Sequence, residues 1–133
     1  MPKGKKMLPF SVCVDLDGTL ISHWSGDYHI KNFGEPLPGA HAFLEQLRAM
    51  GGQITIFTCR GNCRVSGYDA ADCQQIIKNF LDEKGLIYDH VFVGQGKPVA
   101  SYYVDDRGIN CMPQIDPDAY ARTLMHIRAM GDD

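Results

Sequence analysis

The stretch that most constrains the fold of this chain is a short apolar run that ends abruptly in acidic residues. Residues 10–14 read Phe-Ser-Val-Cys-Val, and the sequence Asp-Leu-Asp-Gly-Thr follows directly. An apolar, β-branched run of this kind predicts a central strand of a parallel sheet. Because side chains alternate along a strand, Asp15 and Asp17 are expected to project to the same side of the chain.

Two carboxylates crowded at the end of a buried strand repel each other, and this costs free energy unless a cation or a shared proton lies between them. A divalent metal ion beside Asp15 and Asp17 is the simplest solution. Gly18 permits a backbone conformation that brings the chain close to a ligand, and Thr19 supplies a hydroxyl next to it. The turn therefore predicts a ligand site with a metal ion at the end of this strand.

The rest of the chain alternates strand-like runs with amphipathic helical patterns. Further strands are predicted at residues 53–58, 90–93 and 101–104, and helices at residues 38–50, 69–83 and 116–130. Asp69 is the predicted N-cap of the second helix, and Gly85 closes it. Residues 21–37 lack a sustained period and are predicted to form a loop or small flap. This alternation predicts a three-layer, Rossmann-like α/β fold with a central parallel sheet and helices on both faces.

Each predicted helix has one face that is expected to pack on the sheet. The predicted buried faces are Ala40, Phe43, Leu44, Leu47 and Met50 in the first helix, Cys73, Ile76, Ile77, Phe80 and Leu81 in the second, and Ala119, Tyr120, Thr123, Leu124 and Ile127 in the third. With 133 residues, the chain is expected to form a single domain, with residues 1–7 as a mobile tail.

Composition excludes some classes of function. The net charge of −3 argues against strong, indiscriminate binding of nucleic acid, although it leaves room for a local basic groove. No apolar run approaches the roughly 18 residues that a transmembrane helix needs, so we expect a soluble protein without membrane contact. Five cysteines, an odd number without a secretory context, are expected to be reduced thiols of a cytoplasmic protein.

The cysteine spacing argues against a zinc site. Cys59, Cys63, Cys73 and Cys111 are irregularly spaced, and no His-x-x-x-His accompanies them. A redox or zinc role of the Cys59/Cys63/Cys73 cluster stays open at this stage. Cys13 is expected to pack in the core.

Polar residues suited to phosphate chemistry recur at the strand ends. Thr58 ends the second strand, Lys97 lies in a glycine-rich turn before the fourth, and Asp105 and Asp106 follow the fourth. In an open parallel sheet, ligands bind at the carboxyl edge. Capping, strand propensity or solvation would explain each residue alone, but their order along one edge favours a functional site.

The four elements resemble motifs I to IV of phosphatases of the haloacid dehalogenase superfamily: Asp-x-Asp-Gly-Thr, a strand-terminal Thr, a Lys before the last strand, and Asp-Asp. The resemblance covers about residues 10–109. The intervals after the first two motifs leave no space for a cap domain, so the chain resembles capless members. Arg60 in Thr-Cys-Arg and Arg107 in Asp-Asp-Arg are also similar to the 3′-phosphatase half of polynucleotide kinases.

The resemblance implies a role for each matching residue. Asp15 would be the nucleophile that forms an aspartyl-phosphate, and Asp17 would protonate the leaving group and then activate water. Thr58 and Lys97 would bind phosphate oxygens beside the glycine-threonine turn of Gly18 and Thr19. The implied cofactor is Mg²⁺, and its implied ligands are Asp15, Asp17, Asp105 and Asp106. Which of the last two touches the metal stays open.

The sequence constrains the substrate less than it constrains the fold or the site residues. A site without a lid suits a nucleotide or polynucleotide end, with Arg60 and Arg107 gripping its backbone, or a small metabolite enclosed by an oligomeric neighbour. A phospho-receiver domain and a non-catalytic module that binds a phospholigand or metal are the alternatives to an enzyme. The oligomeric state is left open.

Overall fold

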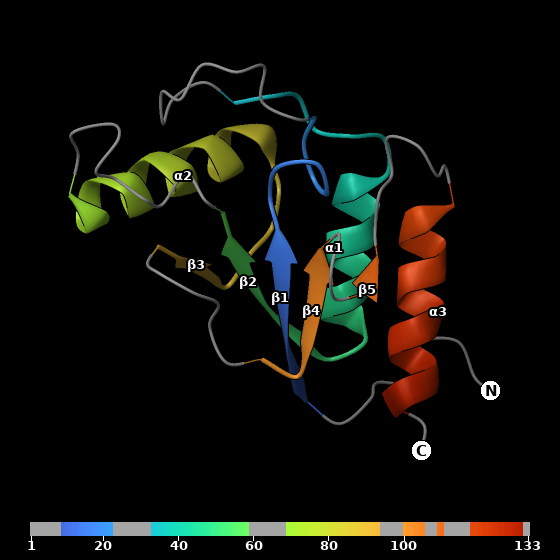
Figure 1. Cartoon of the computed structure of the whole chain (residues 1–133). Helices are drawn as coiled ribbons and strands as arrows, with labels where there is room; N and C mark the ends of the chain where they lie inside the picture. Colours follow the sequence, from blue (N-terminus) through green and yellow to red (C-terminus); the bar gives the residue numbers. More distant parts are fainter. Residues whose placement is uncertain are drawn as a thin grey trace.

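The computed structural model describes residues 9–22, 33–58, 69–93, 100–105, 109–110 and 118–131, and for residues 70, 105, 109, 110, 130 and 131 it describes the backbone alone. The described elements, in chain order, are β1 (Phe10–Asp15), α1 (Ala40–Ala49), β2 (Gly52–Phe57), α2 (Ala70–Lys84), β3 (His90–Phe92), β4 (Tyr102–Asp105), β5 (Ile109–Asn110) and α3 (Ala119–Gly131). Figure 1 shows these strands side by side in one sheet with the helices packed against it.

Strand β1 occupies the centre of the sheet, as the sequence predicted. The strand order is β3-β2-β1-β4-β5, and each pairing in it is parallel. Val12, Cys13 and Val14 are fully buried, so β1 is covered on both of its faces. The fold is therefore an α/β, Rossmann-like one with a central parallel sheet, which confirms the fold class predicted from the alternation of strands and helices.

The helices confirm their predicted packing faces almost completely. All five predicted residues of the α1 face and all five of the α3 face are buried, whereas in α2 Ile76 is half-buried and the other four are buried. The side chain of Asp69 accepts a hydrogen bond from the backbone N–H of Asp72 at 2.8 Å, and Gly85 has φ +71° at the other end of α2. Both helix signals read from the sequence are thus correct.

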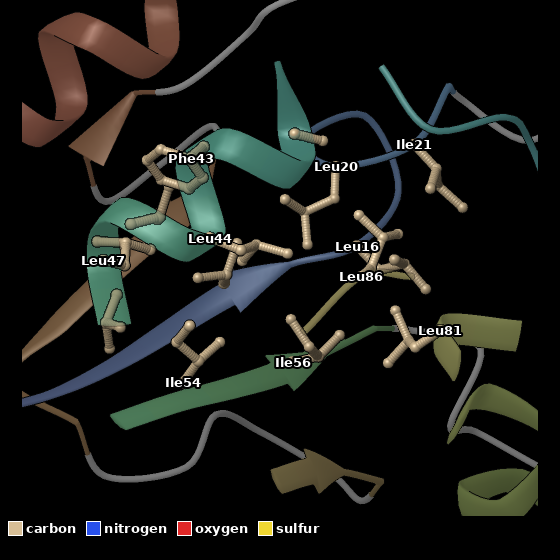
Figure 2. Packing of buried hydrophobic residues seen from close by; sticks show 14 of the residues in the cluster. Leu16, Leu20, Ile21, Phe43, Leu44, Leu47, Ile54, Ile56, Leu81 and Leu86 are labelled. Carbon is tan, nitrogen blue, oxygen red and sulfur yellow. The ribbon is translucent and has the colours of Figure 1, made fainter. Parts of the chain in front are cut away.

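The described helices all pack on one face of the sheet. Side chains from α1, α2 and α3 belong to one hydrophobic cluster with Val12 and Val14 of β1 and with Ile54 and Ile56 of β2. Figure 2 shows Leu44 of α1, Leu81 of α2 and Ile56 of β2 among the side chains of this cluster. A second helical layer, which a three-layer architecture would have, is not among the described residues.

One strand was missed by the sequence analysis, which placed the last strand at residues 101–104. The short strand β5 pairs with β4, with Val104 opposite Ile109 and Asp105 opposite Asn110. A two-residue strand carries no alternation of apolar and polar side chains, so periodicity does not detect it.

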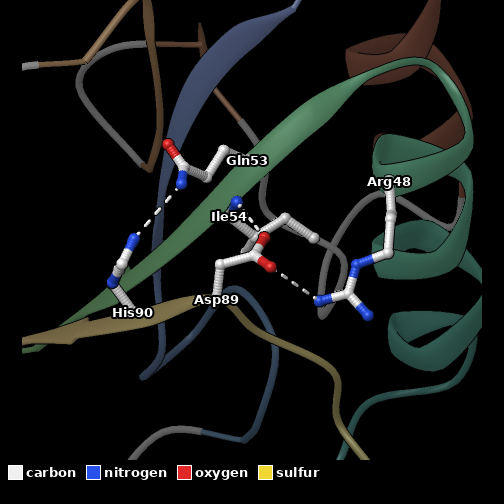
Figure 3. A network of polar contacts seen from close by, with 5 residues as sticks. All are labelled: Arg48, Gln53, Ile54, Asp89 and His90. Atoms are coloured by element: carbon white, nitrogen blue, oxygen red, sulfur yellow. Dashed lines mark hydrogen bonds and ion pairs between the residues drawn. The ribbon is translucent and has the colours of Figure 1, made fainter.

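A polar network at the amino-terminal ends of β2 and β3 ties these strands to α1 (Figure 3). The Asp89 carboxylate accepts a hydrogen bond from the Ile54 N–H at 2.7 Å and another from the Arg48 guanidinium at 3.1 Å. Gln53 Nε2 and His90 Nε2 lie 3.3 Å apart beside it. Because Asp89 satisfies the backbone N–H of Ile54 in β2 and pairs with Arg48 of α1, this network supports the sheet at the edge opposite the candidate site.

The state of the cysteines differs in one case from the prediction that all are reduced. Cys13 is free and fully buried, as predicted. Cys73 is buried and disulfide-bonded, so the prediction of reduced thiols is wrong for this residue. Disulfide pairing depends on spatial approach, which spacing along the sequence does not reveal. Cys59, Cys63 and Cys111 lie outside the described residues.

Within the described part of the chain, each helix is too short or too polar to cross a lipid bilayer.

Candidate functional site

The turn that follows β1 is held by its own backbone. The Leu16 carbonyl accepts hydrogen bonds from the N–H groups of Leu20 at 3.0 Å and Ile21 at 3.1 Å, and the Leu16 N–H continues the sheet ladder to the Phe57 carbonyl at 3.1 Å. The Leu16 side chain is fully buried in the core. The turn is thus anchored to both β1 and β2, and Asp17 lies within it.

Gly18 is required by the shape of this turn. Its φ is +82°, in the region that side chains disfavour, and its N–H donates to the Ile21 carbonyl at 2.8 Å. Asp17 also forms a β-bridge with Ile21. The glycine predicted to allow close approach to a ligand therefore has the backbone conformation that this prediction needs.

Asp17 and Thr58 are in direct contact. The Thr58 hydroxyl donates a hydrogen bond to Asp17 Oδ2 at 2.9 Å, although the two residues lie 41 positions apart. Only 6% of Thr58 is exposed, and Asp17 is half-buried. The threonine predicted to bind phosphate thus holds one of the two predicted catalytic carboxylates.

The sheet register places Asp15, Thr58 and Asp105 at one edge. Asp15 lies opposite Phe57, the residue before Thr58, and Val14 lies opposite Val104, the residue before Asp105. Neighbouring strands are about 4.8 Å apart, so both partners lie within the roughly 10 Å, two strand spacings, that the site requires. This backbone arrangement was predicted from the sequence. The side chain of Asp105 lies outside the described part of the structure.

Thr19 differs from the expectation of a hydroxyl presented to a ligand. Only 2% of the residue is exposed, and its carbonyl accepts a hydrogen bond from the hydroxyl of Tyr120 on α3. These contacts explain Thr19 as part of the support of the turn. Phosphate binding by Thr19 stays a prediction.

Segment 33–37 forms a stem beside the turn. The Ser22 N–H donates to the Glu35 carbonyl at 2.9 Å, and the Glu35 N–H donates to the Ser22 hydroxyl at 3.0 Å. A β-carbon on Gly34 would lie 2.3 Å from the Ser22 carbonyl oxygen, so only glycine fits there without a shift. The two ends of the predicted flap are thereby paired, and residues 23–32 between them lie outside the described residues.

The remaining predicted site residues fall outside the described parts of the chain: Lys97, Asp106, Arg60 and Arg107. Among the described side chains, no three His, Cys, Asp or Glu residues converge as a metal site. The Asp15 carboxylate and the Asp17 backbone carbonyl nevertheless offer the hard oxygen ligands that Mg²⁺ prefers, and the backbone of Asp105 lies at the same edge. This donor set fits a magnesium ion.

Two cavities among the described residues lie away from these carboxylates. One, of about 460 Å³, lies between the stem at Phe33 and the helix α2. Another, of about 900 Å³, lies near Arg48 and Gln53 at the amino-terminal edge of the sheet. Neither is lined by Asp15, Asp17 or Thr58. In a parallel sheet, ligands bind at the carboxyl edge. The candidate site is therefore placed at the carboxylates on that edge and not at either cavity.

Tyr120 is the residue near the site that the sequence did not single out. It was predicted only as one of five packing residues of the last helix. Its hydroxyl reaches the Thr19 carbonyl across 101 positions of sequence. A tyrosine on an apolar helix face gives no signal for such a contact, because the partner is a backbone carbonyl and any residue type supplies one.

Comparisons with known proteins find similar folds among solved structures. Neither a protein-family model nor a curated protein matches the chain. Among solved structures, a conserved protein from Bacteroides thetaiotaomicron matches with a TM-score of 0.60 and 20% identity over 92% of this chain and 92% of that chain. A protein from Vibrio cholerae matches with a TM-score of 0.54 and 26% identity over 88% of this chain and 98% of its own. Solved proteins therefore share this fold over nearly their whole length.

A third solved structure is D,D-heptose 1.7-bisphosphate phosphatase from B. bronchiseptica, complexed with magnesium and phosphate. It matches with a TM-score of 0.44 and 17% identity over 84% of this chain and 62% of that chain.

Proposed function

We propose that this protein is a phosphomonoester hydrolase of the haloacid dehalogenase type that acts through an aspartyl-phosphate on Asp15. The observation that carries the proposal is the contact between Asp17 and Thr58 beside the end of the central strand. It joins a residue of the first motif to a residue of the second, at the edge where parallel sheets bind ligands.

The first step forms the covalent intermediate. A carboxylate oxygen of Asp15 attacks phosphorus, and the bond between phosphorus and the ester oxygen breaks. Carboxylates are ordinarily ionised at neutral pH, so the nucleophile needs no activating base. Asp17 gives its proton to the departing oxygen, which leaves as an alcohol.

The second step releases phosphate. Water attacks the phosphorus of the aspartyl-phosphate and gives a proton to Asp17, and the bond between phosphorus and the Asp15 oxygen breaks. Asp15 is restored as a carboxylate and Asp17 in its protonated form. Because Asp17 serves as acid and then as base, its position matters in both steps, and the Thr58 hydroxyl fixes that position before the substrate arrives.

Phosphate binding and metal binding complete the proposal. Thr58 and Lys97, together with the turn at Gly18 and Thr19, would contact the non-bridging oxygens. The Asp15 carboxylate and the Asp17 backbone carbonyl, with Asp105 or Asp106 at the neighbouring strand end, would hold Mg²⁺. When bound, Mg²⁺ supplies positive charge that offsets the crowded carboxylates and the phosphoryl group.

For the substrate, we propose a nucleotide or polynucleotide end at a site without a cap domain. Arg60 and Arg107 would contact the phosphate backbone. A phosphorylated small metabolite, enclosed by a second subunit, is the competing substrate class. A panel of 3′-phosphorylated oligonucleotides, mononucleotides, sugar phosphates and phosphopeptides separates these classes. Sugar phosphates turned over by a monomer with a specificity constant above that of every oligonucleotide would exclude the nucleic-acid reading.

The deciding experiment is phosphate release by wild type and Asp15→Asn in the presence of Mg²⁺. We expect activity for wild type and none for the variant. Glu45→Gln, which removes one negative charge from the exposed face of α1, is the matched control and keeps full activity. Substantial activity in Asp15→Asn would exclude covalent catalysis by this residue. A long-lived acyl-phosphate without turnover would indicate a receiver domain instead, and no phosphate release from any substrate would favour a binding module.

A further inference from the structure

The turn that carries Asp17 is supported from behind by the last helix of the chain. The hydroxyl of Tyr120, in the first turn of α3, donates a hydrogen bond to the carbonyl of Thr19. Thr19 follows Asp17 by two residues in the same turn. A backbone carbonyl near the reacting groups is therefore fixed by a side chain from the far end of the sequence.

The ring of Tyr120 is itself held in place. Only 9% of the residue is exposed, and its ring stacks on Phe43 of α1 with centroids 4.7 Å apart and an angle of 24° between the planes. Gly39, at the start of α1, approaches the ring so closely that a β-carbon there would lie 3.3 Å from it. Because neighbouring groups restrict the ring, its hydroxyl is aimed at Thr19 before any ligand binds.

Two hydrogen bonds from distant residues thus act on a short segment. The Thr58 hydroxyl binds the Asp17 carboxylate directly, and the Tyr120 hydroxyl binds the backbone of the turn at Thr19. Between them lies Gly18 with φ +82°, and because glycine has no side chain, its backbone is less restricted than that of another residue. The two contacts add to the backbone hydrogen bonds within the turn, which run from Leu20 and Ile21 to Leu16 and from Gly18 to Ile21.

We propose that Tyr120 is a positioning residue for the catalytic turn, acting through Thr19 on Asp17. This inference rests on the proposed phosphatase activity and assigns α3 a part in the reaction. Small displacements of a reacting group have large effects on rate. Loss of the Tyr120 hydroxyl should therefore lower the rate of proton transfer by Asp17 more than it weakens substrate binding.

The variant Tyr120→Phe tests this role because it keeps the ring and its stacking on Phe43 while removing the hydroxyl. We expect kcat to fall about tenfold, the rate equivalent of one hydrogen bond, while KM changes by less than about twofold. On a series of substrates, the loss should be largest for poor leaving groups, which depend most on the proton from Asp17.

Thr123→Val is the matched control. Thr123 lies one turn further along the same buried face of α3, is 1% exposed, and its Oγ1 has no hydrogen-bond partner in the described structure. Replacing an unpaired buried hydroxyl by a methyl group of similar size should leave kcat unchanged and the melting temperature equal or higher. A loss of kcat in both variants would point to general damage of α3 and would overturn the proposal.

Amide hydrogen exchange of residues 16–21 gives a readout that does not depend on activity. Tyr120→Phe should speed exchange in this turn about tenfold relative to Thr123→Val, because the turn loses one of its holding bonds. If exchange in the turn were unchanged, the inference would be overturned whatever the kinetics. It would also be overturned if the loss of kcat were fully explained by the fraction of the variant that is unfolded under the assay conditions. If wild type released no phosphate from any substrate while the exchange difference remained, the proposed function would fail and the support of the turn would stand.

Discussion

At the scale of single residues, the contact between Asp17 and Thr58 is the feature with the clearest chemical consequences. The sequence suggested that both residues lie at one edge, and the structure brings the hydroxyl to 2.9 Å from the carboxylate. Asp17 is the proposed acid and base, and Thr58 is both its holder and a proposed phosphate ligand. The hydroxyl has a single proton, which it donates to Asp17 in this structure, so Thr58 can bind a phosphate oxygen only by turning that proton from Asp17 to the substrate.

Asp17→Asn is expected to lower kcat by at least about 10²-fold, the usual contribution of general acid and base catalysis. An amide cannot give the leaving oxygen its proton, so the loss should be smallest on aryl phosphates whose phenols leave without one. Measuring kcat across phenols of graded acidity checks this. A loss of equal size on every substrate would assign Asp17 a role other than proton transfer.

Thr58→Val is expected to lower kcat/KM by roughly two- to tenfold, since a hydrogen bond between neutral groups is worth about 0.5–1.5 kcal/mol. Valine nearly matches the shape of threonine but lacks the donor. Thr58→Ser keeps the hydroxyl and should retain most of the activity. Steady-state kinetics on both variants, with their melting temperatures, make the test, and equal activity of the valine and serine variants would contradict it.

At the scale of elements, the end of α2 and the approach to β3 are joined by a tyrosine. The Tyr88 hydroxyl donates to Asp82 Oδ1 at 2.9 Å. The pKa of Tyr88 is raised above its usual value, chiefly because burial disfavours the phenolate, and further because of the hydrogen bond to Asp82 and the repulsion by its charge. The folded state therefore prefers the neutral phenol.

This shift predicts a pH dependence of stability. The contribution of Tyr88 is fully present below the unfolded pKa of about 10 and is lost as the pH rises through the higher folded value. Tyr88→Phe should lower the free energy of unfolding by about 0.5–1.5 kcal/mol at pH 7, and the difference from wild type should shrink above pH 10. Urea denaturation of both proteins at pH 7, 9 and 10.5 measures it. A constant difference at all three values would contradict the prediction.

At the scale of the whole molecule, the sheet brings parts of the chain that are far apart in sequence to one edge. The order β3-β2-β1-β4-β5 places the ends of β2 and β4 on either side of β1. A ligand that bridges these ends binds the folded state and not the unfolded one, so it stabilises the fold by mass action.

Removal of divalent metal is accordingly expected to abolish phosphate release, and added Mg²⁺ to restore it. Mg²⁺ with an unreactive phosphate analogue should raise the melting temperature of wild type, whereas Asp15→Asn should show a smaller rise because it lacks one carboxylate ligand. Thermal denaturation with and without the chelator checks both statements. Full activity in excess chelator would exclude the metal from the mechanism.

The sequence by itself determined the elements and their order. Periodicity identified three helices, their buried faces and four of the described strands, and Asp69 and Gly85 marked the two ends of α2, because these signals depend on neighbours within a few residues. Polar residues at strand ends also indicated the edge where Asp15, Asp17 and Thr58 lie, since carboxyl ends of parallel strands meet at one edge.

Only the tertiary structure decided which distant groups touch. It brought Thr58 onto Asp17 and Tyr120 onto the Thr19 carbonyl, added β5, placed the described helices on one face of the sheet, and gave Cys73 a disulfide. Each of these depends on how elements far apart in sequence approach one another in space. Local pattern carries no record of that approach, because packing selects partners by shape and backbone position as well as by residue type.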